Sequence, residues 1–295
     1  MPRSAWTAGL ASTALACGAA PATRPAPATF EVTSAPELVV PASSELTEIR
    51  LAVSPDGNTM LWGSTNRPGG PGGWDIWMTR RAHGTWSPPA PVGFNSDAND
   101  FDPAFSHDGR LVYFFSNRAG GLGGDDIYRV AVTDGGFGAV EHLDAAVNSA
   151  GDEWAPAPGR DGSLLFATDG RGGAGRHDLF IARPSGDRFA PAEPLPGAIN
   201  TPADEFDAAM LPDGSVVFAR SANVDSAPIA LAFARRGPAG YDVGTPLPPS
   251  INGPGAATLG PAIDWTDPSI LYFTGARPEA HAGKLDLYRV RYRLR

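Results

Sequence analysis

The hydrophobic residues of this chain form short runs separated by turn residues and glycine-rich loops. The clearest example lies within 100–130, where the apolar run Leu111–Phe115 is too short for a helix and is rich in β-formers. Asp108-Gly109 precedes that run, Gly120–Gly124 follows it, and a further run begins at Asp126. This pattern predicts strand, tight turn, strand, loop and strand. The Asp-Gly pair predicts a type I′ hairpin turn, in which both central residues have positive φ.

The same unit recurs along the chain, which indicates a repeat architecture. The turns recur at intervals of 52, 53, 52 and 54 residues: Asp56-Gly57, Asp108-Gly109, Asp161-Gly162, Asp213-Gly214 and the variant Asp267-Pro268. The third strands begin at Asp75, Asp126, Asp178, Pro228 and Asp286. A short fourth segment ends each of the first four units: Pro91-Val92, His142-Leu143, Pro194-Leu195 and Pro246-Leu247. Four strands per unit are typical of a β-propeller blade.

The last repeat has no fourth strand of its own, because the count from Tyr288 runs beyond Arg295. The missing strand is expected at the other end of the chain. Leu38 precedes Glu48 by ten residues, as Leu143 precedes Glu153. Pairing this N-terminal strand with the last repeat closes the ring and leaves no long unpaired edge. The sequence therefore predicts an all-β fold, a five-bladed propeller of four-stranded blades over residues 35–295.

Composition agrees with this fold. The 36 glycines and 30 prolines of the 295 residues fall between the predicted strands rather than in one diffuse segment. The net charge is −9 and there is no Lys/Arg cluster, so nucleic acid is not an expected partner. We expect a monomer without a cofactor.

Residues 1–17 resemble an export signal, with Arg3 before an apolar segment of eleven residues that is too short to span a bilayer. Cys17, the one cysteine of the chain, stands where a bacterial lipoprotein signal places its acylated cysteine. The alternative is an ordinary signal peptide cut near Ala16 or Ala20. Residues 18–34 are rich in Ala, Pro and Thr and predict a flexible tether. We expect an exported protein, periplasmic or anchored to the outer membrane, that contacts the membrane only through a lipid anchor.

The second repeat resembles the WD40-like repeats of TolB-type propellers of the bacterial envelope. The resemblance rests on Asp100, Pro103, Ser106, Asp108-Gly109, Ser116-Asn117-Arg118, Gly123-Gly124 and Asp126-Ile127-Tyr128. It covers about 35–295 and implies a propeller fold. TolB-type propellers have six blades, whereas the repeat count here gives five.

Strand direction predicts which residues share the top face, where the fourth-to-first and second-to-third connections lie. One set of residues begins the innermost strands: Glu48, Asp100, Glu153, Glu205 and, in the fifth repeat, Thr258. A second set follows two residues later: Arg50, Asp102, Ala155, Asp207 and Gly260. The acids of the first set are interpreted mainly as caps for backbone N–H groups. The alternative is a ring that binds a basic partner group or Ca²⁺ at the channel mouth.

Other top-face residues have similar alternatives. The aspartates that begin the third strands are expected to accept hydrogen bonds from the glycine-rich loops. Arg67 and Arg118 lie in these loops and either pair with those aspartates or face a ligand. Trp74 and Trp154 are candidates for sugar stacking or a protein contact, although a core position is the simpler interpretation.

Motifs for catalysis are absent from the sequence: it has no Gly-x-Ser-x-Gly, His-Glu-x-x-His or P-loop pattern. The five histidines lack metal-ligand spacing, and of these His177 beside Asp178 is the pair to test. We therefore expect a non-enzymatic propeller that binds an envelope protein or a glycan through its top face. The alternative is a glycoside hydrolase-like enzyme that uses a pair of top-face carboxylates as acid and base.

Overall fold

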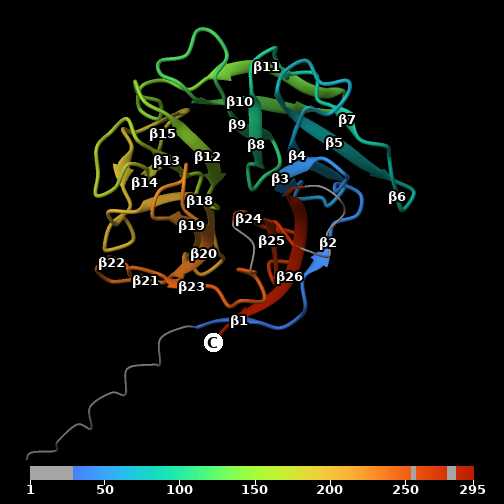
Figure 1. Cartoon of the computed structure of the whole chain (residues 1–295). Coiled ribbons are helices and arrows are strands. Elements are labelled where there is room, and N and C mark those ends of the chain that lie inside the picture. Colours follow the sequence, from blue (N-terminus) through green and yellow to red (C-terminus); the bar gives the residue numbers. More distant parts are fainter. Residues whose placement is uncertain (1–28, 254–256, 278–283) are drawn as a thin grey trace, which may run out of the picture.

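The computed structural model describes residues 29–253, 257–277 and 284–295, and it confirms the five-bladed propeller. Five antiparallel sheets surround a central channel, and each contributes its innermost strand to the channel wall (Figure 1). Within the described ranges no helix is long and apolar enough to cross a membrane. The predicted signal, the lipidation at Cys17 and the first part of the tether lie outside the described residues.

The blades follow one another in chain order. Blade one contains β3 (Thr47–Val53), β4 (Thr59–Thr65), β5 (Trp74–Ala82), β6 (Thr85–Trp86) and β7 (Ala90–Pro91). Blade two contains β8 (Asp100–Phe105), β9 (Leu111–Ser116), β10 (Asp126–Thr133) and β11 (Gly136–His142). Blade three contains β12 (Glu153–Pro158), β13 (Leu164–Thr168), β14 (Asp178–Ala182) and β17 (Glu193–Pro194).

The fourth blade contains β18 (Asp204–Met210), β19 (Val216–Ser221), β20 (Ile229–Ala234) and β23 (Thr245–Pro246). Two short hairpins, β15 (Pro184–Ser185) with β16 (Arg188–Phe189) and β21 (Arg236–Gly237) with β22 (Gly240–Tyr241), extend the third-to-fourth connections of blades three and four. The fifth blade contains β24 (Thr258–Ile263), β25 (Ile270–Gly275) and β26 (Asp286–Leu294), and β1 (Phe30–Val32) and β2 (Glu37–Leu38) both pair with β26.

Ring closure occurs as the sequence predicts. Glu37 pairs with Arg289 and Leu38 with Tyr288, so an N-terminal strand completes the last blade. The boundary of the domain lies earlier than predicted, because Phe30–Val32 also pairs with Tyr292–Leu294. The Phe30 ring stacks on Tyr292 with 4.7 Å between ring centroids. The end of the predicted tether 18–34 therefore belongs to the sheet, since its apolar residues find a partner in the long strand β26.

The Asp-Gly turns lie where predicted, but they are not type I′ turns. In the first repeat only Gly57 has positive φ, at 72°, and its N–H donates to the Ser54 carbonyl. The Asp56 carboxylate accepts hydrogen bonds from the Ser54 hydroxyl and from the Asn58 N–H. The aspartate is thus selected for its side-chain acceptor, and the glycine alone supplies the left-handed conformation.

The hydrophobic core lies between adjacent blades. The aromatic residues of the second strands are fully buried: Trp62, Phe114, Phe166, Phe218 and Phe273. Those of the third strands are 4% exposed: Trp77, Tyr128, Phe180 and Tyr288. These positions confirm the interpretation that the repeated aromatic residues fill the space between blades.

We expect stepwise N-terminal truncation to separate the contributions of the two closing strands. A chain that starts at residue 34 lacks β1 and loses the ring stacking of Phe30. A chain that starts at residue 44 also lacks β2, the buried Val39 and Ala42, and the hydrogen bond from Val39 N–H to Leu287 C=O (2.8 Å). Burial of one Val-sized side chain contributes about 1.5–3 kcal/mol. Only the second truncation should abolish cooperative thermal unfolding and cause aggregation, measured by circular dichroism and size-exclusion chromatography. Equal melting temperatures for both chains would contradict the closure argument.

Candidate functional site

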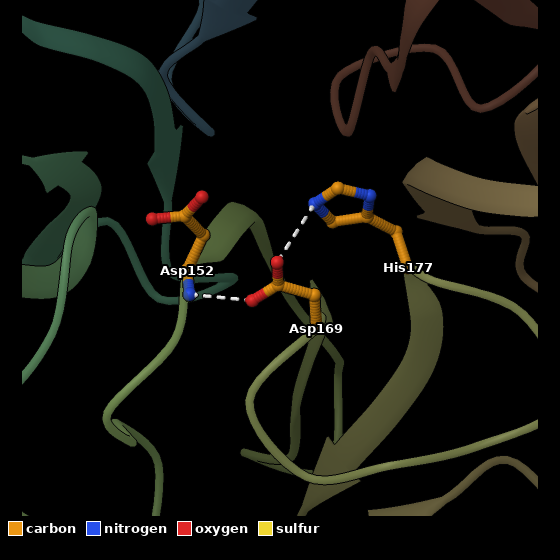
Figure 2. Close-up of side chains that lie close together, drawn as sticks. All are labelled: Asp152, Asp169 and His177. Carbon is orange, nitrogen blue, oxygen red and sulfur yellow. Dashed lines mark hydrogen bonds and ion pairs between the residues drawn. The ribbon is translucent and has the colours of Figure 1, made fainter. Parts of the chain in front are cut away.

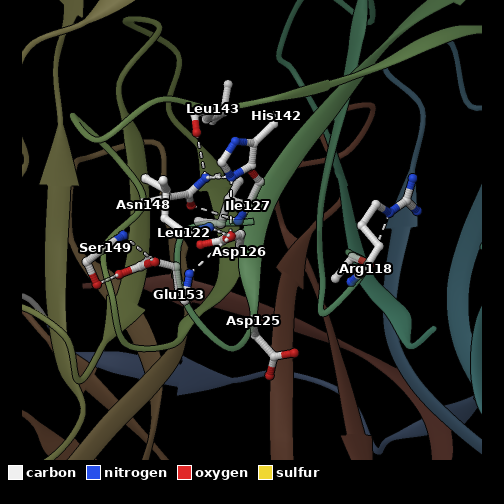
Figure 3. A network of polar contacts seen from close by, with 12 residues as sticks. Arg118, Leu122, Asp125, Asp126, Ile127, His142, Leu143, Asn148, Ser149 and Glu153 are labelled. Carbon is white, nitrogen blue, oxygen red and sulfur yellow. Dashed lines mark hydrogen bonds and ion pairs between the residues drawn. The ribbon is translucent and has the colours of Figure 1, made fainter. Parts of the chain in front are cut away.

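The inner carboxylates are buried, and the connections that lead into their strands use them as caps. Glu153 is 0% exposed and accepts hydrogen bonds from the Ser149 N–H (2.8 Å) and the Ser149 hydroxyl (Figure 3). It also accepts one from the Thr168 hydroxyl (2.7 Å). Burial raises the pKa of Glu153 against the opposing effect of these donors.

The other blades repeat this contact, always with the residue four positions earlier. The pairs are Glu48 with Ser44, Asp100 with Ser96, and Glu205 with Thr201, through both the backbone N–H and the side-chain hydroxyl. All four acids are 0% exposed. The capping interpretation is therefore confirmed, because each carboxylate satisfies donors of its own connection that would otherwise be buried without acceptors.

The loop arginines contact these inner acids rather than the aspartates of the third strands. Arg67 lies 3.5 Å from Glu48, and Arg118 pairs with Asp100 and donates to the Phe94 carbonyl (3.1 Å). Arg220, which the sequence did not single out, takes the same role with Glu205 at 2.7 Å. These arginines are partly buried and connect the second strand of a blade to the first. Their positive charges are therefore paired with carboxylates of the same blade.

The aspartates of the third strands hold the glycine-rich loops, as predicted. Asp75 accepts from the Gly72 N–H, Asp126 from Leu122 and Gly123, and Asp178 from Gly175. The close approach explains the glycines: a Cβ at Gly121 would stand 1.9 Å from the Asp126 carboxylate.

A repeated asparagine was missed by the sequence analysis. Asn148, 1% exposed, accepts from the Ile127 N–H (2.8 Å) and donates to the Ile127 and Leu143 carbonyls (Figure 3). The two bonds to the third strand recur at Asn95, Asn200 and Asn252, and Asn252 also donates to the Leu247 carbonyl as Asn148 does to Leu143. In the fifth blade Ser43 takes this place against Leu287. The intervals of 53, 52 and 52 residues between these asparagines are the signal that could have revealed them.

The second set of predicted residues lies inside the channel, not on the open top face. Every innermost strand has a bulge, and at each bulge one residue has positive φ between 45° and 58°: Arg50, Asp102, Ala155, Asp207 and Gly260. Non-glycine residues in this region cost about 1–3 kcal/mol each, so the ring of blades must hold them there.

Arg50 is the central residue of the channel. Its guanidinium donates to the Pro156 and Ala208 carbonyls (3.2 and 3.3 Å) and lies 3.9 Å from Asp207. Asp207 in turn accepts from the Gly260 N–H at 2.9 Å. Asp102 is also buried, and its Oδ1 has no hydrogen-bond partner among the described residues. Burial raises the pKa of Asp102 well above its ordinary value, and the charge of Asp207 adds to the rise.

The two predicted tryptophans are partly buried and in contact with other rings. Trp74 stacks on Phe101, with 5.5 Å between centroids. Trp154 stacks on His177, with 4.0 Å between centroids and an interplanar angle of 18°, and its Nε1 donates to Asp125 at 2.8 Å. Burial raises the pKa of Asp125 to about 6.

A polar cluster among the top connections was only partly predicted from the sequence. The ring nitrogens of His177 face Asp204, the first residue of β18, and Asp169, at the other end of the same loop, rather than its sequence neighbour Asp178. Figure 2 shows His177, Asp169 and Asp152, which come from two connections of the chain: Asp152 precedes β12, and Asp169 and His177 lie at the two ends of the loop between β13 and β14. The ligand atoms of these three residues lie within 4.8 Å of one another. This cluster is the strongest candidate site in the described part of the chain.

We expect Glu153→Ala to lower the free energy of unfolding by about 1–3 kcal/mol, because it leaves the buried Thr168 hydroxyl and the part-buried Ser149 N–H without their acceptor. Chemical denaturation measures the change. Glu141→Ala is the matched control: Glu141 is 58% exposed and pairs with Arg129 on the surface, so its loss should cost less than about 1 kcal/mol. Equal effects of the two substitutions would contradict the capping role.

We expect Asp102→Asn to stabilise the protein at pH 7 but not near pH 4. The raised pKa means that the folded state holds a proton on Asp102 more tightly than the unfolded chain, whose value is near 3.8. The stability cost of Asp102 is therefore absent below that pH and grows as pH rises toward the folded-state pKa. Each pKa unit corresponds to about 1.4 kcal/mol. Urea denaturation at both pH values measures the difference.

Asp108→Asn is the contrasting variant, because the Ser106 hydroxyl lowers the pKa of Asp108. It should show no gain at pH 7. A gain for Asp102→Asn that is the same at pH 4 and pH 7 would contradict the electrostatic explanation.

Comparison with known proteins gives the fold but no family. No family model matches the sequence, and no curated protein is significantly similar to it. Among solved structures, TolB from Acinetobacter baumannii has a TM-score of 0.53 at 14% identity; the match covers 86% of this chain and 57% of that one. A putative TolB from Agrobacterium tumefaciens has a TM-score of 0.50 at 14% identity, over 90% and 91% of the two chains. Hydrazine synthase from Kuenenia stuttgartiensis has a TM-score of 0.54 at 14% identity, over 82% of this chain and 37% of that chain. The chain is a five-bladed β-propeller that resembles TolB in fold.

Proposed function

We propose that this protein is a non-enzymatic propeller of the cell envelope that binds a partner through its top face. The observation that carries the proposal is the burial of all four inner carboxylates. A glycoside hydrolase needs two carboxyl groups that reach the substrate, one as acid and one as base or nucleophile. Here Glu48, Asp100, Glu153 and Glu205 are 0% exposed and accept hydrogen bonds from their own connections.

A protein is favoured over a glycan as the partner. One ring face of Trp74 is covered by Phe101 and one face of Trp154 by His177, and the Trp154 N–H is already bonded to Asp125. Less of each ring is therefore left for stacking on a sugar. The exposed charged groups of the top connections, such as Asp97 and Asp225, suit a polar protein surface instead.

Export to the envelope is supported by the N-terminal sequence, with its short apolar segment and Cys17, and by the similarity in fold to TolB proteins. A lipid on Cys17 would place the propeller at a membrane surface. The stretch from Cys17 to β1 would then serve as its tether.

The proposed binding is tested by charge reversal on the two faces of the ring. The double variant Asp97→Arg and Asp225→Arg changes exposed residues of top connections, whereas Asp134→Arg and Asp187→Arg changes exposed residues of third-to-fourth connections at the opposite face. We expect pull-down from envelope extract to lose its specific partner with the first variant and to retain it with the second. Equal recovery with both would contradict top-face binding.

The enzymatic alternative is tested separately on a polysaccharide panel. The wild-type protein should give no turnover. Turnover that Glu153→Gln or Glu205→Gln abolishes, while the melting profile stays cooperative, would overturn the proposal in favour of a glycan-cleaving enzyme.

A further inference from the structure

The buried ring of His177 has one nitrogen paired and one nitrogen unpaired. The side chain is 0% exposed, beneath the indole of Trp154. Nδ1 lies 3.3 Å from Oδ1 of Asp204. Nε2 lies 3.9 Å from Oδ2 of Asp169 and has no hydrogen-bond partner among the described residues. A buried polar atom without a partner is costly, and this one faces a carboxylate.

The contact with Asp204 assigns the tautomer. A carboxylate accepts a hydrogen bond, so Nδ1 of the neutral ring carries the hydrogen and Nε2 presents its lone pair toward Asp169. A lone pair and a carboxylate repel each other unless a positive species lies between them. The gap of 3.9 Å is too long for a direct N–H···O hydrogen bond, which spans about 2.7–3.2 Å. Two ligand atoms bonded to one tetrahedral metal ion at about 2.0–2.2 Å are about 3.3–3.6 Å apart, so these two atoms need to approach each other by only a few tenths of an ångström to bind one ion.

Asp152 and Asp169 carry negative charge where the repeat needs only an amide. Asp169 accepts a hydrogen bond from the Asp152 N–H (2.8 Å), and Asp152 accepts one from the Asp125 N–H (2.9 Å). In the preceding blade these two roles belong to Asn117 and Asn99, with bonds of 2.9 and 3.1 Å. The structural bond uses one oxygen of each aspartate, and an oxygen of each lies within 4.8 Å of a His177 nitrogen.

We propose that Asp152, Asp169 and His177 bind one divalent transition-metal ion of the Zn²⁺ class. One imidazole and two carboxylates are ligands that Zn²⁺ accepts in four-coordinate sites, with water in the remaining position. Ca²⁺ prefers six to eight oxygen ligands and is less suited to a site with a nitrogen donor. Asp204 is a positioning residue, since its contact with Nδ1 fixes the ring and directs Nε2 into the site.

The site goes beyond the proposed partner binding and does not depend on it. Its three ligands come from the fourth-to-first connection before β12 and from the loop between β13 and β14, so a bound ion would tie two top connections together. Failure of the partner experiment would leave the metal site unaffected, because the variants used there contain none of its residues.

Titration of the purified full-length chain with Zn²⁺ tests the proposal. The Cys17→Ser background removes the one thiol, so that it cannot supply a competing ligand. Isothermal titration calorimetry should show one Zn²⁺ per chain. Asp169→Asn and Asp152→Asn should each weaken binding at least about 10-fold while retaining the fold, because they restore the amides of the preceding blade. Asp204→Asn should weaken it about 10- to 100-fold, the range for residues that position a metal ligand.

Two controls make the result decisive. His142→Gln changes a histidine that contacts Asp126 at 3.3 Å but belongs to no such cluster in the described chain, so it should leave the affinity unchanged. Tryptophan fluorescence gives a second readout, because one of the seven tryptophans, Trp154, stacks on a proposed ligand. Absence of saturable one-to-one binding, an affinity unchanged in both Asp169→Asn and Asp152→Asn, or tighter binding of Ca²⁺ than of Zn²⁺ would overturn the proposal.

Discussion

The pairing of an N-terminal strand with β26 is the constraint on which the rest of this structure depends. Blades two to four follow one another along the chain, but the last sheet is complete only when Glu37 and Leu38 lie beside Tyr288 and Arg289. Residues separated by about 250 positions must therefore meet before the inner strands can surround a channel. The fold consequently has a high entropic cost of closure, which the burial between neighbouring blades must offset.

Within the closed ring, the repeated polar residues act as internal connectors. A carboxylate caps each of the first four inner strands, and an asparagine anchors the third strand of each of the first four blades through both its N–H and its C=O. Because these groups recur in register, a position that departs from the pattern is the informative one. His177 occupies the position that Asp125 holds in the preceding blade, and Asp169 occupies the position of Asn117. Both of these changed positions belong to the same cluster among the top connections.

The blade count, the closing strand and the capping acids could be predicted because each leaves a periodic trace in the sequence. The turn type was predicted wrongly, because an Asp-Gly pair suits two kinds of turn. In one, both residues have positive φ; in the other, which the structure has, the aspartate side chain accepts a hydrogen bond and only the glycine has positive φ. The bulges that turn Arg50 and Asp102 into the channel have no marker, because left-handed conformation at Arg is not encoded by the residue itself. Only His177 of this cluster could be singled out from the sequence. Asp169 stands eight residues before it in the same loop, and Asp152 comes from another connection, so neither is a sequence neighbour of the histidine.

The Arg50 side chain also connects blades that are not neighbours in the ring. Its side chain starts in the first blade and ends on carbonyls of the third and fourth blades, so it crosses the lumen. Beyond it, toward the Asp-Gly corners, the lumen is lined by small and apolar side chains such as Ala52, Ala209 and Ile263. The guanidinium therefore links the first blade to the third and fourth across the ring. A shorter side chain at this position would not reach both carbonyls, so the length of arginine is what joins three blades across the ring.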